Sequence, residues 1–389
     1  MSFLDKNTYI LNFGPHHPST HGVLRLILEL SGEEILSCNP DIGYLHRGVE
    51  KIIEEKKFLS IIPFLDRLDY LAPVLQEHAF VNAIEKILKI NVPRRALIIR
   101  TIFDELTRIS SHIMGIGSAS FELGCLSLFL YGFEEREKIM DIFEATTGAR
   151  MHLAYYIPGG VLSDIDDEIT SRINSFIEGI TLFYESVENL TLNSRIFRKR
   201  TEGIGYISEE LAIKSGISGV NLRASGINYD IRKTIPYGIY NEIEFEPITS
   251  RDGDCFARNK LRFLEIKQSI DIIKQSLKLL EPGPINCYGY FSRTEEEGTL
   301  YELLHEAYFS IGIEVPKDTV IYSSVESPRG EFGIHLFTKS DQTKPYRMRL
   351  KSPSFAHIQL LKDLLVGSRI ADATAIMGSL DFVISDCDR

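Results

Sequence analysis

The feature that most constrains the fold is a set of long segments whose apolar residues recur every three or four positions. Ile98–Ile113 follows this spacing, with Pro93 near the expected helix start, and Leu261–Leu280 follows it too. The period places apolar side chains on one face of an α-helix. Glu281-Pro282-Gly283-Pro284 should end the second helix, and Val161–Arg195 indicates a third. Several such helices predict a bundle core.

The two ends of the chain predict strands. Thr8–Phe13 and Val23–Leu30 flank a loop bounded by Gly and Pro, and a further extended piece follows near Glu34–Ser37. Near the other end, Thr319–Ser324 and Phe332–Phe337 resemble a strand pair.

We therefore predict an α+β fold in one compact unit, with a β region at 1–45, a helical bundle core at 46–315 and a small α+β part at 316–389. A helix should begin at Ser352-Pro353 and run to Gly367.

Composition narrows the classes of partner. The 389 residues include 43 Lys and Arg against 54 Asp and Glu, giving a net charge of −11. Such a chain is a poor candidate for nucleic-acid binding. Its apolar stretches are far shorter than the roughly 20 residues of a membrane span, and we expect no signal peptide. If the protein works at a membrane, other chains should hold it there.

The five cysteines are scattered and none forms a C-x-x-C pair. Iron–sulfur clusters and structural zinc sites need clustered ligands. We therefore expect this chain to hold no such centre by itself.

Three histidines, His16, His17 and His21, lie in the loop between the first two strands. Imidazole is a common metal ligand, but Pro18 disfavours the helix that would bring two of them together. The other interpretations are histidines that are exposed or bonded to backbone, and a histidine that offers a proton to a ligand.

Three further segments could carry chemistry, although each is unspecific alone. Asp66–Tyr70 places four polar groups just before an expected helix at Leu71–Leu88, and Gly148–His152 is a turn with aromatic neighbours. The longest non-periodic segment, Ile217–Pro236, is predicted to be a functional loop. Its Gly-rich basic part could bind an anion, but no nucleotide pattern is present.

Taken in order, these motifs resemble the 49-kilodalton (D) subunit family of respiratory complex I, the NADH:quinone oxidoreductase. The resemblance covers essentially the whole chain, through Asn12–Leu26, His46–Glu50, Asp66–Tyr70, Phe133–Lys138, Gly148–Gly160, Leu222–Lys233, Gly253–Arg258, Glu331–Gly333, Phe355–His357 and Asp388-Arg389.

That family is related to the large subunits of nickel–iron hydrogenases, so the resemblance implies a hydrogenase-like fold with a quinone pocket at the old metal site. The two nickel-ligand motifs of hydrogenases correspond to Arg67–Ala72 and Asp381–Asp386, which lack cysteine at the ligand positions. Cys387 is one residue out of register. No metal is expected in this chain, and hydrogen chemistry is excluded.

The resemblance also implies roles for single residues. Tyr70 and His21 would hydrogen-bond the quinone headgroup and supply protons. Glu122, where the family usually has Asp, would pair with His21, and Asp69 would join the proton network around Tyr70. Two further residues, Arg47 and His152, would lie near the terminal iron–sulfur cluster, which the neighbouring B subunit holds.

The implied function is that of one subunit in a proton-translocating enzyme, with quinone as substrate and with FMN and iron–sulfur clusters on neighbouring subunits. Its partners would be the iron–sulfur B subunit, the C subunit, other peripheral-arm subunits and the membrane arm, with no nucleic acid. The location would be the cytoplasmic side of a bacterial inner membrane or the matrix side of the mitochondrial one.

Several alternatives stay open. A catalytically inert scaffold and a metal-dependent hydrogenase subunit are the rival functions. Ferredoxin or a deazaflavin could replace NADH as donor to the whole complex, and the quinone could be ubiquinone or menaquinone.

Overall fold

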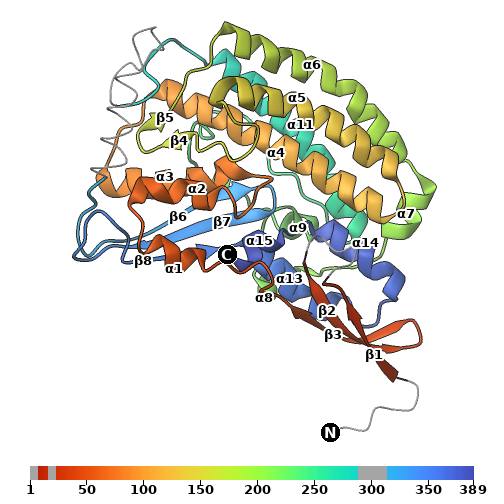
Figure 1. Ribbon diagram of the computed structural model, residues 1–389. Helices are drawn as coiled ribbons and strands as arrows, with labels where there is room; N and C mark the ends of the chain where they lie inside the picture. Colours follow the sequence, from red (N-terminus) through yellow and green to blue (C-terminus); the bar gives the residue numbers. More distant parts are fainter. Residues whose placement is uncertain (1–7, 16–22, 288–312) are drawn as a thin grey trace.

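The computed structural model describes residues 8–15, 23–287 and 313–389, which form an α+β fold (Figure 1). The predicted fold class is confirmed. The long helices lie side by side in the upper part of Figure 1: α3 (Pro73–Leu88), α4 (Arg94–Glu122), α5 (Leu126–Thr147), α6 (Asp167–Leu190) and α11 (Cys255–Lys278). Among the described helices, none is long and apolar enough to cross a membrane.

Helix α4 is the centre of the bundle and contacts α3, α5, α11 and α14 (Ile370–Leu380). The predicted apolar repeat within it is confirmed, because Ile98, Ile102 and Leu106 are fully buried. The helix also buries charged side chains such as Arg108, which need partners in the interior. Those partners shape the rest of the fold.

The N-terminal strands are β1 (Thr8–Phe13), β2 (Arg25–Ser31) and β3 (Glu34–Asp41), and they form an antiparallel sheet in sequence order. Alternate β2 residues, Leu26, Leu28 and Leu30, are fully buried, as the two-residue period of a half-buried strand requires. The third strand continues past the predicted Ser37.

A second antiparallel sheet, β6 (Val320–Ser327), β7 (Gly330–Phe337) and β8 (Arg347–Lys351), packs against α3. The predicted strand pair is confirmed. The strands extend beyond the predicted Ser324 and Phe332, because Ser327 pairs with Gly330 and leaves only Pro328 and Arg329 in the turn. This short turn buries Arg329.

The long helix predicted over Val161–Arg195 is present as α6, but it is shorter at both ends. Val161 lies in strand β5 (Gly160–Val161), which pairs with β4 (Tyr156–Ile157). The helix begins only after Asp166, whose carboxylate accepts a hydrogen bond from the Ile169 N–H, and a separate helix, α7 (Arg195–Thr201), follows it.

The segment Ile217–Pro236, predicted to be an irregular functional loop, contains the short helices α9 (Gly219–Ala224) and α10 (Ile231–Thr234). Its basic side chains Arg223 and Arg232 are fully buried. The prediction is therefore wrong, and the segment belongs to the interior.

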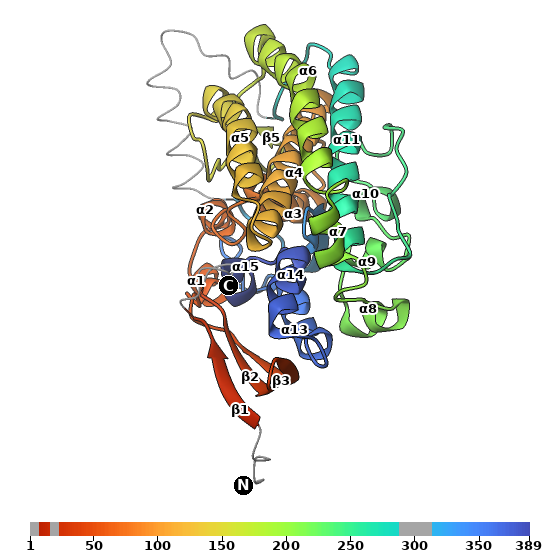
Figure 2. The same cartoon turned by 90° about the vertical axis from the view of Figure 1, so that its right-hand side faces the viewer.

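Figure 2 shows the C-terminal helices lying between the bundle and the N-terminal sheet. The predicted helix after Ser352 is α13, and it ends at Leu364, three residues before Gly367. The remaining described elements are α1 (Val49–Ile53), η1 (Phe58–Ile61), α2 (Ile62–Leu65), α8 (Glu209–Ser215), α13 (Pro353–Leu364) and α15 (Ile384–Asp388). The division of the chain at 45 and 315 stays a prediction.

Candidate functional site

The turn between α2 and α3 carries Asp69 and Tyr70 side by side in different surroundings. Asp69 is buried, whereas Tyr70 is 43% exposed. The Asp69 carboxylate accepts a hydrogen bond from the Leu71 N–H at 3.2 Å, which fixes the turn just before α3 begins. The turn therefore places the Asp69 carboxyl in the interior and leaves the Tyr70 side chain partly exposed.

Arg329, from the β6–β7 turn, holds Asp69 in the interior. Its Nη1 donates to Asp69 Oδ1 and Oδ2 at 3.0 and 2.8 Å and to Ser111 Oγ at 3.0 Å. Its Nη2 donates to Asp381 Oδ1 at 3.4 Å. Arg262 Nε lies 3.7 Å from the other oxygen of Asp381. Two arginines thus face two aspartates in a buried cluster.

Burial sets the protonation of this cluster. It raises the pKa of Asp69 to about 6, against the opposing effect of Arg329. Burial also raises the pKa of Asp386 and that of Tyr70, whose phenol is protonated at neutral pH even without this shift. Burial lowers the pKa of Arg262 to about 10. The cluster combines a carboxyl that titrates near neutral pH with a phenol that keeps its proton.

The two segments that the resemblance matches to hydrogenase ligand motifs, Arg67–Ala72 and Asp381–Asp386, lie against each other. Ser385 Oγ donates a hydrogen bond to the Leu68 carbonyl at 2.6 Å, and Arg329 links Asp69 to Asp381. Among the described residues, no group of three or more His, Cys, Asp and Glu side chains is placed to hold a metal ion.

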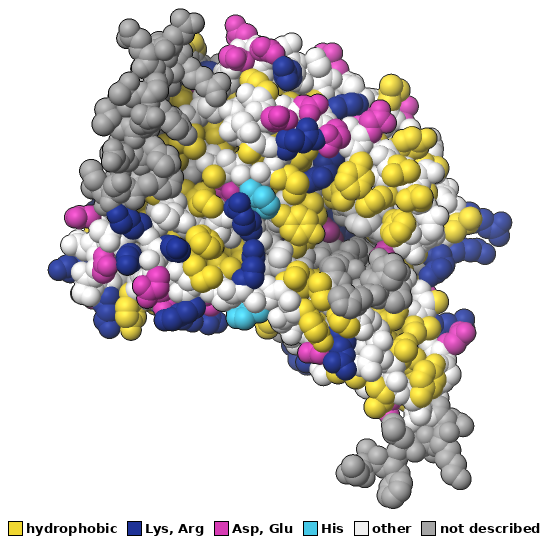
Figure 3. Space-filling view, viewed as in Figure 1, with side chains coloured by type: hydrophobic (Ala, Val, Ile, Leu, Met, Phe, Trp, Pro, Cys, Tyr) yellow, Lys and Arg dark blue, Asp and Glu magenta, His cyan; other side chains and the backbone are white. Residues whose placement is uncertain are grey.

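Arg47 and His152 both contact this same turn. Arg47 Nη2 donates to the Arg67 carbonyl at 2.9 Å, and His152 Nδ1 lies 3.2 Å from the Asp66 carbonyl. Figure 3 shows basic side chains beside histidine on the face viewed. The fold therefore brings together four of the six predicted site residues, in two neighbouring pairs.

The loop that carries Arg47 is fixed by the far end of the chain. Asp388 accepts hydrogen bonds from the N–H groups of Gly43 and Leu45 at 2.9 and 2.8 Å. Its carbonyl oxygen lies 2.7 Å from Nδ1 of His46. This anchoring holds Arg47 beside Arg67.

Glu122 is the last residue of α4 and is half-buried; a Cβ added at Gly378 of α14 would lie 3.6 Å from its Cγ. It is seven residues beyond Gly115, which packs against Asp381, so about 10 Å of helix separates the two points. Burial raises the pKa of Glu122 to about 8, and its Oε2 has no hydrogen-bond partner in the described part of the chain. His16, His17 and His21 lie outside the described residues.

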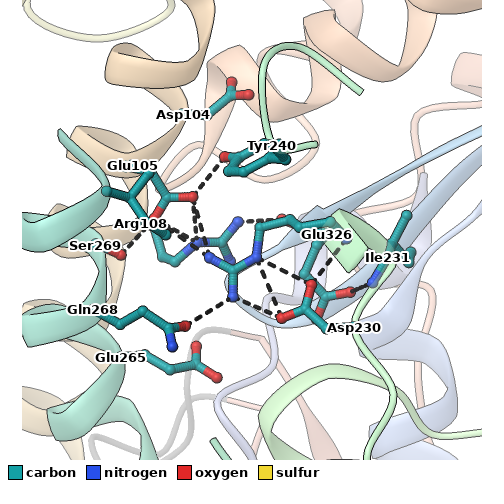
Figure 4. Close-up of polar contacts among 12 residues, drawn as sticks. Asp104, Glu105, Arg108, Asp230, Ile231, Tyr240, Glu265, Gln268, Ser269 and Glu326 are labelled. Carbon is teal, nitrogen blue, oxygen red and sulfur yellow. Dashed lines mark hydrogen bonds and ion pairs between the residues drawn. The ribbon is translucent and has the colours of Figure 1, made fainter. Parts of the chain in front are cut away.

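The two arginines of the basic segment that could bind an anion are instead paired with carboxylates inside the protein. Arg223 donates to Glu265 at 2.7 Å and to Glu326 at 2.6 Å. Arg232 lies 2.7 Å from Asp230 and 3.2 Å from Glu105. Figure 4 shows these carboxylates converging from separate elements. Arg223 and Arg232 are therefore not an anion site, because both guanidinium groups already face carboxylates in the core.

Known proteins match this chain along its length. The family model described as respiratory-chain NADH dehydrogenase, 49 Kd subunit, matches residues 122–389. A protein of Pelagibacter ubique, named as the D subunit of NADH-quinone oxidoreductase, is 44% identical over 388 residues, which is 98% of each chain. The chain belongs to the 49 Kd subunit family of respiratory-chain NADH dehydrogenase.

Two further proteins that carry the same name support the assignment. The one from Rickettsia prowazekii is 43% identical over 99% of this chain and 100% of its own. The one from Neisseria meningitidis serogroup B is 40% identical over 98% of each chain. The chain is therefore a subunit of complex I, a multisubunit oxidoreductase, and other complex I subunits are its partners. The resemblance stated from the motifs is confirmed.

The sequence did not reveal Arg329 as a site residue. It stands directly before Gly330 and the Glu331–Gly333 motif, but a single arginine in a turn has no local pattern that predicts burial. Ser111 and Arg262 were missed for the same reason, since only the packing of α4 and α11 brings them here. Asp381 was part of a recognised motif, and its role as a counter-charge appears only in the fold.

Proposed function

We propose that this complex I subunit forms, with the iron–sulfur B subunit, the pocket in which quinone is reduced to quinol. Tyr70 and His21 would bind the headgroup oxygens and donate the two protons. The observation that carries the proposal is the accessible Tyr70 phenol, which lies beside the buried Asp69–Arg329–Asp381 cluster. The terminal cluster of the B subunit would supply the two electrons.

Tyr70 suits the role of proton donor. Its phenol is protonated at neutral pH already at its ordinary pKa of 10.0, which partial burial raises further, so it can donate a hydrogen bond to a quinone carbonyl. Arg329 and Arg136 act in the opposite direction and would stabilise the phenolate left after the proton moves. Asp69 titrates close to neutral pH and would take part in returning a proton to Tyr70.

His21 would be the second donor, held by Glu122. The buried Glu122 oxygen without a described partner supports a cation from the loop at 16–22. Residues Phe13 and Leu24 flank that loop and share a hydrophobic cluster with Met377 of α14, while Gly378 of the same helix contacts Glu122. Glu122 has one methylene more than the usual Asp, which lengthens its reach.

Arg47 and His152 would face the terminal cluster of the B subunit. A cation beside a cluster favours its reduced form, because added electrons are negative charge. Both side chains contact the turn that carries Tyr70, so the donor side and the quinone side would meet there. FMN and the other clusters would belong to neighbouring subunits.

The proposed setting follows the family. The C subunit, other peripheral-arm subunits and the membrane arm would surround this chain. It would lie as a peripheral protein on the cytoplasmic side of a bacterial inner membrane, or on the matrix side of a mitochondrial one. Charge rearrangement after quinone reduction would then drive proton translocation in the membrane arm.

Replacing Tyr70 by Phe tests the proposal. The variant removes one oxygen, so the complex should assemble, whereas quinone reduction should fall at least about 100-fold. Electron transfer from NADH to an artificial acceptor that bypasses quinone should persist. Tyr206→Phe, at another exposed tyrosine outside the site, is the matched control. Unchanged quinone reduction in Tyr70→Phe would favour the inert-scaffold alternative.

A further inference from the structure

Two buried carboxyl groups lie close to each other near His152. Asp66 follows α2, Glu77 lies in α3, and both are 0% exposed. Both accept hydrogen bonds from the backbone segment at 154–156, and each acts on the pKa of the other. Two ionised carboxylates have no proton to place between them and repel each other strongly in a buried setting.

The segment after His152 uses one oxygen of each carboxyl group. The Ala154 N–H donates to Asp66 Oδ2 at 3.0 Å. The Tyr155 and Tyr156 N–H groups donate to Glu77 Oε2 at 2.8 and 2.7 Å. The other two oxygens, Asp66 Oδ1 and Glu77 Oε1, are buried and find no donor among the described residues. A single proton between them would satisfy both.

Glu85, another carboxyl group on α3, differs from this pair because a buried cation neutralises its charge. Glu85 lies eight residues after Glu77, and it accepts from Arg100 Nη2 at 2.6 Å and from the Gly159 N–H at 2.7 Å. Its charge therefore has a buried cation as partner. The Asp66–Glu77 pair has no ion pair of this kind in the described structure.

The surrounding groups do not cancel the repulsion between the two acids. His152 and Arg67 act to lower the pKa of Asp66, but burial outweighs them and raises it. Burial and Asp66 together raise the pKa of Glu77 well above its usual range. The nearby phenols point elsewhere: Tyr155 donates to the Ser163 carbonyl, and Tyr156 donates to the Arg100 carbonyl and to Asp104.

We propose that Asp66 and Glu77 share one proton at neutral pH and that this acid pair is the positioning element for His152. His152 and Ala154 both adopt left-handed backbone angles, with φ of 57° and 44°, which are costly for residues other than glycine. The three N–H contacts with the acid pair hold the segment in that shape. Any effect of this positioning on electron transfer rests on the proposed function of His152, whereas the shared proton does not depend on that function.

Matched glutamine variants of assembled complex I test the shared proton. Glu77→Gln keeps an oxygen for the two N–H groups and places an amide donor toward Asp66, so it imitates the protonated acid. We expect normal assembly and a thermal dissociation temperature within about 2 °C of the unaltered complex. Glu85→Gln breaks the ion pair with Arg100 and should lower that temperature by at least about 4 °C. Equal losses in both variants would overturn the proposal.

A double substitution gives a second, independent signature. In Asp66→Asn the amide oxygen accepts from Ala154 and the amide nitrogen can donate to Glu77, so this variant should also assemble. When Glu77→Gln is added, both amide oxygens accept hydrogen bonds from backbone N–H groups. The two NH₂ groups then face each other, and neither can accept a hydrogen bond from the other. The decrease in thermal dissociation temperature in the double variant should exceed the sum of the decreases in the two single variants. Additive losses would contradict a shared proton.

Infrared difference spectra of the purified complex locate the proton directly. The unaltered protein should show the carbonyl band of one protonated carboxyl that Glu77→Gln lacks, and Glu85→Gln should keep that band. Because the folded pKa of the pair is raised, its contribution to stability is lost as pH rises above the usual carboxyl range, and Glu77→Gln should not show this loss. No spectral difference would refute the shared proton. The quinone proposal fails separately, through activity in Tyr70→Phe.

Discussion

Arg329 donates from one nitrogen, Nη1, to both carboxylate oxygens of Asp69, although the two residues are 260 positions apart in the sequence. Both side chains are buried, and the same guanidinium also contacts Ser111 and Asp381. One arginine therefore joins the turn before α3, the β6–β7 turn, α4 and the end of α14. The partly exposed Tyr70 directly follows Asp69 in the first of these turns.

Arg329→Met should destabilise the folded chain by about 3–5 kcal/mol, because it leaves Asp69 and Asp381 buried with less counter-charge. The loss should appear as a reduced amount of assembled complex I in membranes. Arg349→Met is the control, since Arg349 is 58% exposed and lies 3.6 Å from Glu50. That exposed pair should contribute at most about 1 kcal/mol. Equal assembly of the two variants would show that the buried cluster tolerates the missing charge.

The proposed pairing of His21 with Glu122 predicts a particular pH dependence. Without a cation, burial holds the pKa of Glu122 at about 8, above its ordinary 4.5. The stability that its proton contributes is then present at low pH and lost as pH rises through about 8. His21→Gln should therefore show a fall in dissociation temperature up to about pH 8. The double variant with Glu122→Gln should lack this fall, since an amide does not titrate.

The unaltered complex should also lack that fall, because a charged His21 would keep Glu122 ionised. Glu185→Gln, an exposed carboxyl on α6, serves as the control for loss of one surface charge. If His21→Gln and the unaltered complex show the same pH profile, the two residues are not paired.

Arg223→Met should cost about 3–5 kcal/mol, because Glu265 and Glu326 both depend on this guanidinium in the core. The matched control is Arg198→Met, which removes an exposed pair with Glu202 on the surface of α7. Surface pairs are worth at most about 1 kcal/mol. Resistance of the complex to thermal dissociation distinguishes the two; comparable values would mean that the buried network adds no stability.

Two glycine-to-alanine substitutions should change the stability of the fold in opposite directions. Gly330 has φ +133°, and a Cβ there would lie 2.4 Å from Ser218 Oγ, so Gly330→Ala should destabilise by at least about 1 kcal/mol. Gly179 is in the exposed part of α6 with nothing within 4 Å of an added Cβ. Gly179→Ala should stabilise by about 0.5–1 kcal/mol. A tolerated Gly330→Ala would show that α9 and β7 can move apart.

The bundle was predictable where a long apolar repeat was undisturbed. In α4 and α11 the repeat runs over several turns, so the period alone identifies the helix. Strand β8 was missed although Arg347–Lys351 alternates basic and apolar residues, with Met348 and Leu350 buried. Five residues between loops give a weak signal, and only pairing with β7 makes it a strand.

The errors around Val161–Arg195 and Ile217–Pro236 have different causes. Val161 pairs with Tyr156, only five residues earlier, in a hairpin whose two-residue strands give a weak sequence signal. The partners of Arg223, in contrast, are Glu265 and Glu326, which are remote in the sequence. A glycine-rich basic segment suggests an anion site only if its charges are accessible. Their neutralisation by remote carboxylates has no local signature.

The candidate site was identified in part through the resemblance and not through local pattern. Asp69 and Tyr70 were singled out as neighbours, and the fold shows why they differ, since one side chain is buried against Arg329 and the other is accessible. The roles of Tyr70, Glu122, Arg47 and His152 stay predictions, as does the role of His21, which lies outside the described residues.

The hydrogen bonds between Asp388 and the loop at 43–47 have a consequence for biosynthesis. Gly43 and its acceptor are 345 positions apart, so the segment that places Arg47 leaves the ribosome long before the residue that fixes it. Until Asp388 is made, the loop lacks these two hydrogen bonds, and Arg47 has no fixed place beside Arg67. The placement of Arg47 beside Arg67 should therefore follow the synthesis of Asp388.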